Sequence, residues 1–322
     1  MAESASSRPL HLRTMDSARP APAPVDALLR RFRNQRPLRG GSLLITIFGD
    51  AIAPRGGRVM LGSLIGLAAP FGLSERLVRT AVARLATEGW LVGTRHGRRS
   101  EYRLTGTGEK LFAEATRRIY RANPTAWDGK WTLVVLPPQC PRPRRNLREE
   151  LRWLGFGQLA PGVFAHPSCT VEEARRWLTP QGLAEQGWFF RSAPEGLEQD
   201  RRLAAAGWDL AEIARRYRRF RDSFAPVLAA AGTDLAPPSA FLVRTLLIHE
   251  YRKVHLRDPQ LPPQLLPQPW IGAEAYELCR RLYALVFASA EHYLTQTATA
   301  AEEVLPPPGP AVYERFDGVV AS

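Results

Sequence analysis

Residues 61–105 read LGSLIGLAAPFGLSERLVRTAVARLATEGWLVGTRHGRRSEYRLT. The order of residue types in this stretch predicts a short helix, a tight turn, a second helix and a basic two-stranded hairpin. This order is typical of a winged helix-turn-helix, whose second helix can enter the major groove of a DNA duplex. The stretch therefore predicts a DNA-reading unit, around which the other segments of the chain can be placed.

The second helix of this unit is predicted from Glu75 to Thr87. Ser74 is a favourable N-cap, and an acid at position 75 suits the positive end of the helix dipole. At about 100° per residue, one face is apolar and consists of Leu77, Val78, Ala81, Val82 and Leu85. The opposite face consists of Arg76, Arg79, Thr80, Ala83 and Thr87. By itself, this pattern also fits an ordinary amphipathic helix with a solvated basic face.

The hairpin that follows this helix favours DNA binding over the interpretation of a solvated basic face. Leu91 and Val92 begin a strand, residues 93–97 supply a turn, and residues 101–104 return with alternating polarity. A cationic tip beside a groove-reading helix suits DNA phosphates or the minor groove. The predicted DNA-contacting residues are Ser74, Arg76, Arg79, Thr80, Ala83, Arg84, Arg95, His96, Arg98, Arg99 and Arg103.

The distribution of charge supports this location for a nucleic-acid partner. The first 125 residues hold 21 Lys and Arg against 9 Asp and Glu, a net charge of +12, whereas the whole chain carries +13. Cations are needed only where a polyanion is contacted, so the excess of positive charge indicates that the first third of the chain contacts the nucleic acid. A length of 322 residues and an apolar content of 45% predict two or three globular domains.

Neither a membrane segment nor a cysteine framework is evident. No apolar run approaches the roughly 20 residues of a membrane span, and no signal peptide is recognised, so we expect a soluble cytoplasmic protein without a membrane partner. Cys140, Cys169 and Cys279 lie far apart and form no C-x-x-C pair. We therefore expect inert thiols in a reducing compartment, without a zinc knuckle or disulfides.

The rest of the sequence predicts an α+β multidomain protein. Residues 1–24 are expected to form a disordered tail and residues 25–122 the winged helix-turn-helix domain, with further helices at 25–33, 42–53 and 107–120. Asn123-Pro124 and Asp128-Gly129 mark a boundary. Residues 123–195 then predict the order βαββαβ of a ferredoxin-like domain. Its strands are expected at 130–136, 156–159, 163–166 and 188–191, and its helices at 144–154 and 171–178.

The remaining residues predict an all-α C-terminal domain over 196–302 and a loose tail over 303–322. Its helices are expected at 209–224, 239–254 and 274–295, with a proline-stiffened connector at 258–267.

Five stretches together resemble the PaaX-type transcriptional repressors, which regulate phenylacetic acid degradation. They are SLLITIFGDAIAPRGG (42–57), LSERLVRTAVARLATEGWL (73–91), YRLT (102–105), WDGKWTLVVLP (127–137) and HEYRKVHLRDPQLPPQLLPQPWIG (249–272). The resemblance implies a homodimeric repressor with a winged helix, a central domain similar to Cas2 and a ligand-sensing C-terminal domain. It also implies release from operator DNA by an aryl-CoA thioester such as phenylacetyl-CoA. A repressor of the same family that responds to another acyl-CoA is an alternative.

The effector could contact two groups of residues. Arginines at 215–221 could receive CoA phosphates, although they also suit a solvated face or an interface with DNA or the partner subunit. Trp208, Trp270, Tyr276 and Tyr283 could line an aryl pocket, although aromatic residues at helical spacing also suit a core. The predicted ligand residues are Arg215, Arg218, Arg219, His249, Tyr251, Arg252 and Trp270.

An enzyme is the alternative from another class, namely a metal-dependent nucleic-acid-processing enzyme built on the Cas2-like domain. Its acidic metal ligand would follow the first strand, where Pro137-Pro138 stands instead, while Asp128 precedes the strand. His249 and His255 are six residues apart, not the four that a zincin helix requires. We expect a polar network at Asp258 and predict no catalytic residues, no metal site and no cofactor.

Overall fold

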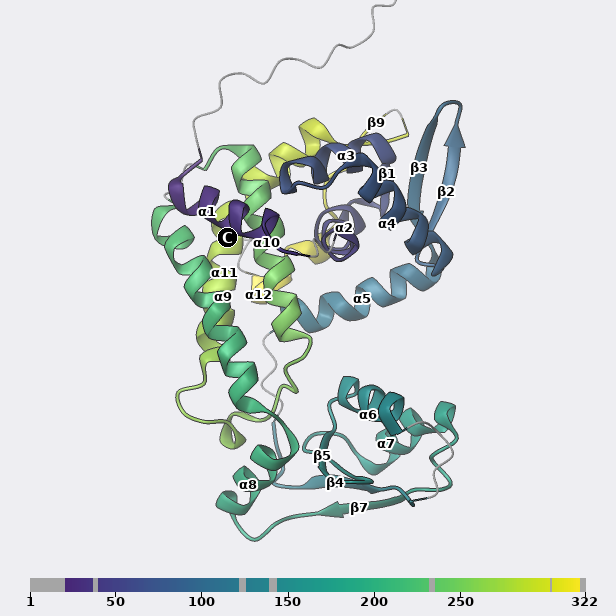
Figure 1. Ribbon diagram of the computed structural model, residues 1–322, viewed down its shortest axis with the longest axis vertical. Coiled ribbons are helices and arrows are strands. Elements are labelled where there is room, and N and C mark those ends of the chain that lie inside the picture. Colours follow the sequence, from purple (N-terminus) through teal and green to yellow (C-terminus); the bar gives the residue numbers. More distant parts are fainter. Residues whose placement is uncertain are drawn as a thin grey trace, which may run out of the picture.

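Three long helices connect two ends of the molecule that differ in architecture (Figure 1). The computed structural model describes residues 21–36, 40–121, 126–138, 144–231, 235–301 and 303–318. Most of the expected N-terminal tail, the boundary at Asn123-Pro124 and Cys140 lie outside the described residues. The hairpin β2–β3 lies at one end of the helices and the sheet that contains β4 and β7 lies at the other.

The N-terminal part is a set of helices with a small sheet. Its elements are α1 (Ala23–Arg33), α2 (Gly40–Ile47), the π-helix η1 (Phe48–Ile52), η2 (Ala53–Arg55), β1 (Arg58–Met60), α3 (Leu61–Ala68), η3 (Ala69–Phe71), α4 (Glu75–Thr87), β2 (Leu91–His96), β3 (Arg99–Leu104) and α5 (Gly106–Tyr120). The sheet has the order β1-β3-β2 and is antiparallel. The predicted order of helix, turn, helix and hairpin is therefore present, with β1 added.

Local sequence signals explain α4 and the hairpin. The bounds predicted for α4 are confirmed, and the Ser74 hydroxyl accepts a hydrogen bond from the Leu77 amide at 3.3 Å. Val78 and Val82 are buried, but the side chain of Leu77 is 40% exposed. The predicted apolar sector was too wide, because Val78, Val82 and Leu85 are buried and Ala81 is partly buried, whereas Leu77 at its edge faces solvent. The predicted turn was too long, since Gly97 adopts a positive φ of 58° and lets the strands pair up to His96.

The central part has the predicted ferredoxin-like order. Its elements are β4 (Trp131–Val135), α6 (Arg144–Trp153), β5 (Gly157–Ala160), β6 (Val163–His166), α7 (Val171–Leu178), the short η4 (Thr179–Gln181) and β7 (Trp188–Ser192). The antiparallel sheet has the order β5-β6-β4-β7. Val134 and Phe164 of the sheet share a hydrophobic core with Leu151 of α6 and Leu178 of α7.

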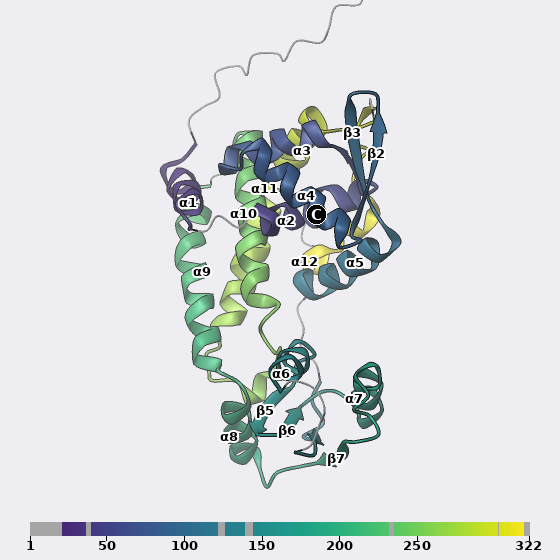
Figure 2. The same ribbon diagram turned by 45° about the vertical axis from the view of Figure 1, so that its right-hand side comes forward.

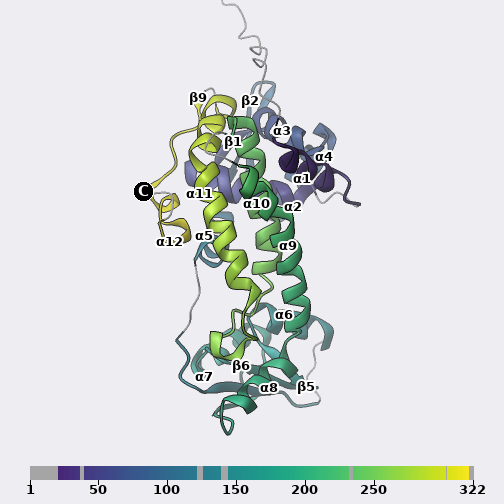
Figure 3. The ribbon, with the colours of Figure 1, turned by 90° about the vertical axis from the view of Figure 1, so that its left-hand side faces the viewer.

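The C-terminal part is mainly helical, as predicted. It consists of α8 (Leu197–Gly207), α9 (Leu210–Ala230), α10 (Pro237–His255), η5 (Pro263–Leu265), α11 (Ile271–Thr297), β8 (Thr299–Ala300), β9 (Glu303–Val304), η6 (Pro310–Val312) and α12 (Arg315–Gly318). Helices α9, α10 and α11 lie side by side (Figure 3). The predicted end of α9 at Phe224 is wrong, because the helix continues through Pro226 and the buried Val227 keeps its last turn packed.

The segment from residue 303 to residue 318 is not the loose tail that we expected. Leu305, Val312 and Phe316 are buried, and the Phe316 ring lies 5.2 Å from the ring of Tyr120 and 5.2 Å from that of Tyr283. Its prolines prevent long regular helices, but they do not prevent burial of the apolar side chains between them.

One hydrophobic core joins the N-terminal and C-terminal parts. It contains Leu43 of α2, Val82 of α4, Phe224 of α9 and Phe241 of α10, whereas the core between the central sheet and α6–α7 is separate. The helices that support the hairpin therefore pack directly on the C-terminal helices. Within the described ranges, no helix combines the length and apolar character needed to span a bilayer.

Candidate nucleic-acid interface and its connections

The solvent-facing side of α4 carries the residues that the sequence placed there. Ser74, Arg76, Arg79, Thr80, Ala83 and Arg84 are all exposed. The Arg79 guanidinium lies 2.7 Å from the Glu75 carboxylate, and that of Arg84 lies 3.2 Å from Glu88. Exposed ion pairs of this kind are weak, so both arginines can exchange them for contacts with an anion.

The hairpin adds a second group of cations beside α4 (Figure 2). Its predicted residues Arg95, His96, Arg98, Arg99 and Arg103 are all exposed. Arg79 of α4 and Arg98 and Arg99 of the hairpin line one cavity of about 330 Å³, together with the first residues of α3. The structure thus brings cations from the helix and the hairpin to one place.

Glu101 fixes the base of the hairpin. Its side chain is 3% exposed and accepts hydrogen bonds from Arg58 at 3.0 Å and from the Ala301 amide at 2.7 Å. Burial raises the pKa of Glu101, but the bonds from Arg58 and Ala301 outweigh burial and hold the pKa below its ordinary value. We did not predict this residue; a single acid inside a basic hairpin was the available signal. Through Ala301, the hairpin is joined to the segment after α11.

A buried ionic cluster lies under α2. Asp50, in the π-helix that follows α2, accepts hydrogen bonds from Arg244 at 2.7 Å, Arg315 at 2.8 Å, Tyr120 at 2.6 Å and Tyr283 at 3.0 Å. Burial raises the pKa of Asp50, but the two arginines overcome this effect and keep the pKa below its ordinary value. Arg244 also pairs with Glu291 of α11. No local sequence pattern indicates this cluster, which joins η1, α5, α10, α11 and α12.

Two predicted ligand residues instead hold α10 against α2. The Nδ1 atom of His249 lies 3.0 Å from the Thr46 hydroxyl, and the Arg252 guanidinium donates to Thr46 at 2.8 Å and to the Ser42 hydroxyl at 2.8 Å. Burial lowers the pKa of His249 well below its ordinary value, with smaller effects from Lys253 and Arg252. His249 is therefore neutral at pH 7, and its position is at a contact between helices.

Tyr251, another predicted ligand residue, belongs to the polar network that we expected at the end of α10. The His255 Nδ1 atom lies 3.0 Å from the Tyr251 hydroxyl and 3.2 Å from that of Tyr217, which donates to Asp258 at 2.8 Å. Asp258 also accepts from the Gln260 amide, which fixes the connector after the helix. Trp270 packs on Tyr217 and Tyr283 is buried in the core, whereas Trp208 lines a separate cavity of about 1000 Å³.

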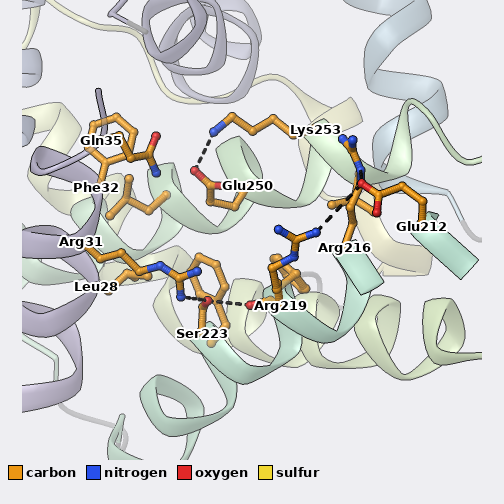
Figure 4. A pocket seen from close by; sticks show the side chains of 14 residues that line it. Leu28, Arg31, Phe32, Gln35, Glu212, Arg216, Arg219, Ser223, Glu250 and Lys253 are labelled. Atoms are coloured by element: carbon orange, nitrogen blue, oxygen red, sulfur yellow. Dashed lines mark hydrogen bonds and ion pairs between the residues drawn. The ribbon is translucent and has the colours of Figure 1, made fainter. Parts of the chain in front are cut away.

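A basic pocket lies between α1, α9 and α10 (Figure 4). Its volume is about 360 Å³ and it is lined by four cations and two acids, namely Arg31, Arg216, Arg219, Lys253, Glu212 and Glu250. Of the seven predicted ligand residues only Arg219 lines this pocket; Arg215 and Arg218 are exposed elsewhere on α9. The structure therefore does not gather the seven residues at one site.

The acidic residue and the cysteines that an enzyme could use have other environments in the structure. Asp128 forms an ion pair with Arg191 at 2.8 Å. Among the described residues, no group of three or more His, Cys, Asp and Glu side chains is placed to hold a metal ion. Cys169 and Cys279 are buried, and burial raises the pKa of Cys169 to about 12, which disfavours the reactive thiolate.

Comparison with known proteins agrees with this architecture. Residues 39–108 match the family described as PaaX-like protein, residues 124–204 the PaaX protein central Cas2-like domain, and residues 208–296 the PaaX-like protein C-terminal domain. Transcriptional repressor PaaX from Escherichia coli (strain K12) is 37% identical over 301 residues, which cover 92% of this chain and 95% of that protein. The chain belongs to the PaaX family of transcriptional repressors.

A solved structure was also matched. The uncharacterized protein Rv0674 from Mycobacterium tuberculosis is 26% identical, with a TM-score of 0.45, over 72% of this chain and 88% of that chain.

Proposed function

We propose that residues 40–121 form a winged helix-turn-helix that binds operator DNA, with α4 in the major groove and the hairpin β2–β3 as the wing. The observation that carries this proposal is the convergence of Arg79, Arg98 and Arg99 on one cavity. A phosphate of the duplex backbone would lie against this cavity. Arg76 and Thr80 then face the base edges, since both are exposed on the same side of α4.

We further propose that the repressor acts in the cytoplasm as a homodimer joined through its central domain. Strand β7 is an edge of the sheet, and its Trp188 and Phe190 side chains are 59% and 51% exposed. An unpaired edge with exposed aromatic side chains is suited to pairing with a second copy. A twofold arrangement would present two copies of α4 to successive major grooves of a pseudo-palindromic operator.

The proposed signal is an aryl-CoA thioester, such as phenylacetyl-CoA, that favours a conformation unable to bind the operator. This choice of effector rests on the family resemblance. A repressor of aromatic acid degradation needs a metabolite whose concentration follows the supply of the acid and which alters binding to the operator. A member of the family that responds to another acyl-CoA would share the same architecture. The identity of the acyl group is therefore an outcome of the experiment below.

The test begins with selection of a duplex from a random pool by the full-length protein. Fluorescence anisotropy then measures binding of the selected duplex, and a panel of acyl-CoA thioesters is added to the complex. We expect phenylacetyl-CoA to release the duplex. The variant Arg76→Ala should weaken binding of the selected duplex by about 1–3 kcal/mol while leaving binding to random duplex nearly unchanged. Failure to enrich any sequence would contradict the proposal.

A further inference from the structure

The pocket between α1, α9 and α10 combines an apolar floor with an excess of positive charge. The floor consists of Leu28, Phe32, Phe220, Phe224 and Leu246, all of which are buried. Their side chains come from all three helices. An apolar group placed here would contact aromatic and aliphatic carbon, which gives affinity through loss of water from both surfaces.

The cations around the pocket are incompletely neutralised. Arg216 pairs with Glu212 at 2.7 Å, and Lys253 pairs with Glu250 at 2.8 Å. Arg219, however, lies 4.0 Å from the Glu212 carboxylate.

The remaining cation is Arg31. It donates to the neutral hydroxyl of Ser223 at 2.6 Å. Figure 4 shows Arg31 and Arg219 on neighbouring sides of the pocket. Arginines in these positions can exchange weak contacts for charge-assisted hydrogen bonds to a carboxylate or phosphate.

We propose that this pocket is the effector site and that it binds an organic anion carrying an apolar group. The apolar group lies on the floor, and the anionic group faces Arg31 and Arg219. The inference rests on the proposed function for the identity of the ligand, an acyl-CoA thioester. Since a volume of about 360 Å³ is at the lower end for ligand pockets, it encloses only the acyl end of such a molecule. The phosphates, which the pantetheine arm separates from the acyl group, lie outside the floor, against the exposed Arg31 and Arg219.

Helix α1 connects this pocket to the segment before α4. Phe32, which belongs to the floor, packs edge-on against Phe71 at 6.1 Å between ring centroids and against His249 at 5.6 Å. The next residue, Arg33, donates to the Pro70 carbonyl at 3.0 Å from its Nε atom. Pro70 and Phe71 belong to η3, directly before the turn that leads to the Ser74 cap of α4. A ligand that displaces α1 therefore displaces the support of this turn.

This connection gives the ligand a way to affect DNA binding at a distance. A ligand shifts an equilibrium only if it binds the two conformations with different affinity. Here the difference arises because α1 forms one wall of the pocket and also contacts the η3 turn. Ligand occupancy of the pocket and the orientation of α4 are thereby coupled through α1.

The site is tested by calorimetric titration of the full-length protein, without DNA, with phenylacetyl-CoA, CoA and phenylacetate. The variants are Arg219→Glu and, as the matched control, Arg218→Glu, an exposed neighbour on α9 that does not line the pocket. We expect Arg219→Glu to weaken binding of the thioester at least about 10-fold, whereas Arg218→Glu changes it less than about 2-fold. Both side chains are exposed, so thermal melting should confirm that both variants fold.

Each result has a defined meaning. Equal effects of the two substitutions, or no binding of any of the three compounds by the wild type, would overturn the site. CoA binding as tightly as its thioester would overturn the role of the apolar floor. Because these titrations contain no DNA, they measure ligand binding to the pocket separately from DNA binding. A wild-type protein that binds the thioester but no duplex would contradict the proposed function and leave the site supported.

The connection through α1 has its own variant. Arg33→Ala removes the contact with Pro70 but leaves the pocket lining intact. We expect this variant to bind the thioester and the duplex with wild-type affinity. The factor by which the thioester lowers duplex affinity should be at least about 5-fold smaller for the variant than for the wild type. Release equal to that of the wild type would overturn the connection.

Discussion

The Nε atom of Arg244 donates to the Oδ2 atom of Asp50 at 2.7 Å, and the two side chains are 1% and 3% exposed. The pair spans 194 positions of sequence and joins α10 to the π-helix that ends α2. Because α2 packs against α4, the pair fixes the C-terminal helices to the base of the proposed DNA-binding unit. The two parts are therefore expected to move and unfold together.

The first prediction concerns this pair. Asp50→Asn removes the buried carboxylate that pairs with Arg315 and leaves Arg244 with Glu291, and breaking a buried pair in this way costs about 3–5 kcal/mol. Chemical denaturation should show the destabilisation as a lower midpoint. Glu198→Gln, which removes an ion pair exposed on both sides, serves as the control and should leave the midpoint unchanged. An Asp50→Asn midpoint equal to that of the wild type would contradict a structural role for the cluster.

Acid should destabilise the fold through three histidines whose pKa is lowered in the folded protein. Burial lowers the pKa of His166 to about 4 and that of His255 to about 4, and it lowers the pKa of His249 well below 6.5. The unfolded chain therefore binds more protons below pH 6.5, and stability falls as the pH decreases from there toward 4. At pH 5.5 each of these histidines should cost about 1.4 kcal/mol of unfolding free energy.

Urea denaturation at several pH values measures this effect. A midpoint that stays constant between pH 7.5 and 5 would refute the prediction. The lowered pKa of Asp50 adds a separate destabilisation only below its ordinary value of 3.8, as the carboxylate becomes protonated.

The hairpin should bind DNA without reading its sequence. Replacing Arg98 and Arg99 by Ala is expected to weaken binding to selected and random duplexes alike, because both side chains face the phosphate backbone in the proposed complex. The slope of log affinity against log salt should decrease by about 0.9 for each phosphate that is no longer neutralised. Anisotropy titrations at several salt concentrations give both values, with exposed Arg202→Ala as the control. An unchanged slope would exclude the hairpin from the interface.

Oligomeric state should depend on the edge of the central sheet. The double substitution Trp188→Ser and Phe190→Ser removes the exposed aromatic side chains of β7 without touching the core that faces α6 and α7. We expect a dimeric wild type and a monomeric variant by light scattering coupled to size-exclusion chromatography. Exposed Trp153→Ser on α6 is the matched control and should stay dimeric. A variant that remains dimeric would place the dimer contact elsewhere.

The elements that local sequence could predict are those determined by neighbours in the chain. The Ser74 cap and the spacing of Val78, Val82 and Leu85 define α4, because a helix is formed by contacts three and four residues apart. Alternation and turn residues similarly define the order βαββαβ. The exposure of the predicted DNA-contacting arginines follows from the same periodicity, since an apolar stripe turned toward the core leaves the opposite face in solvent.

Tertiary structure decided the roles of residues whose partners are distant. His249 and Arg252 looked suited to a ligand, yet they contact Thr46, which is more than 200 positions away. The segment near Phe316 looked loose because its own sequence is rich in proline, yet rings of Tyr120 and Tyr283 enclose it. The sequence by itself determined helices, strands and the location of charge, because these depend on short-range geometry. Only folding determined which polar groups are buried together and that α1 closes a pocket over α9 and α10, because burial depends on which surfaces meet.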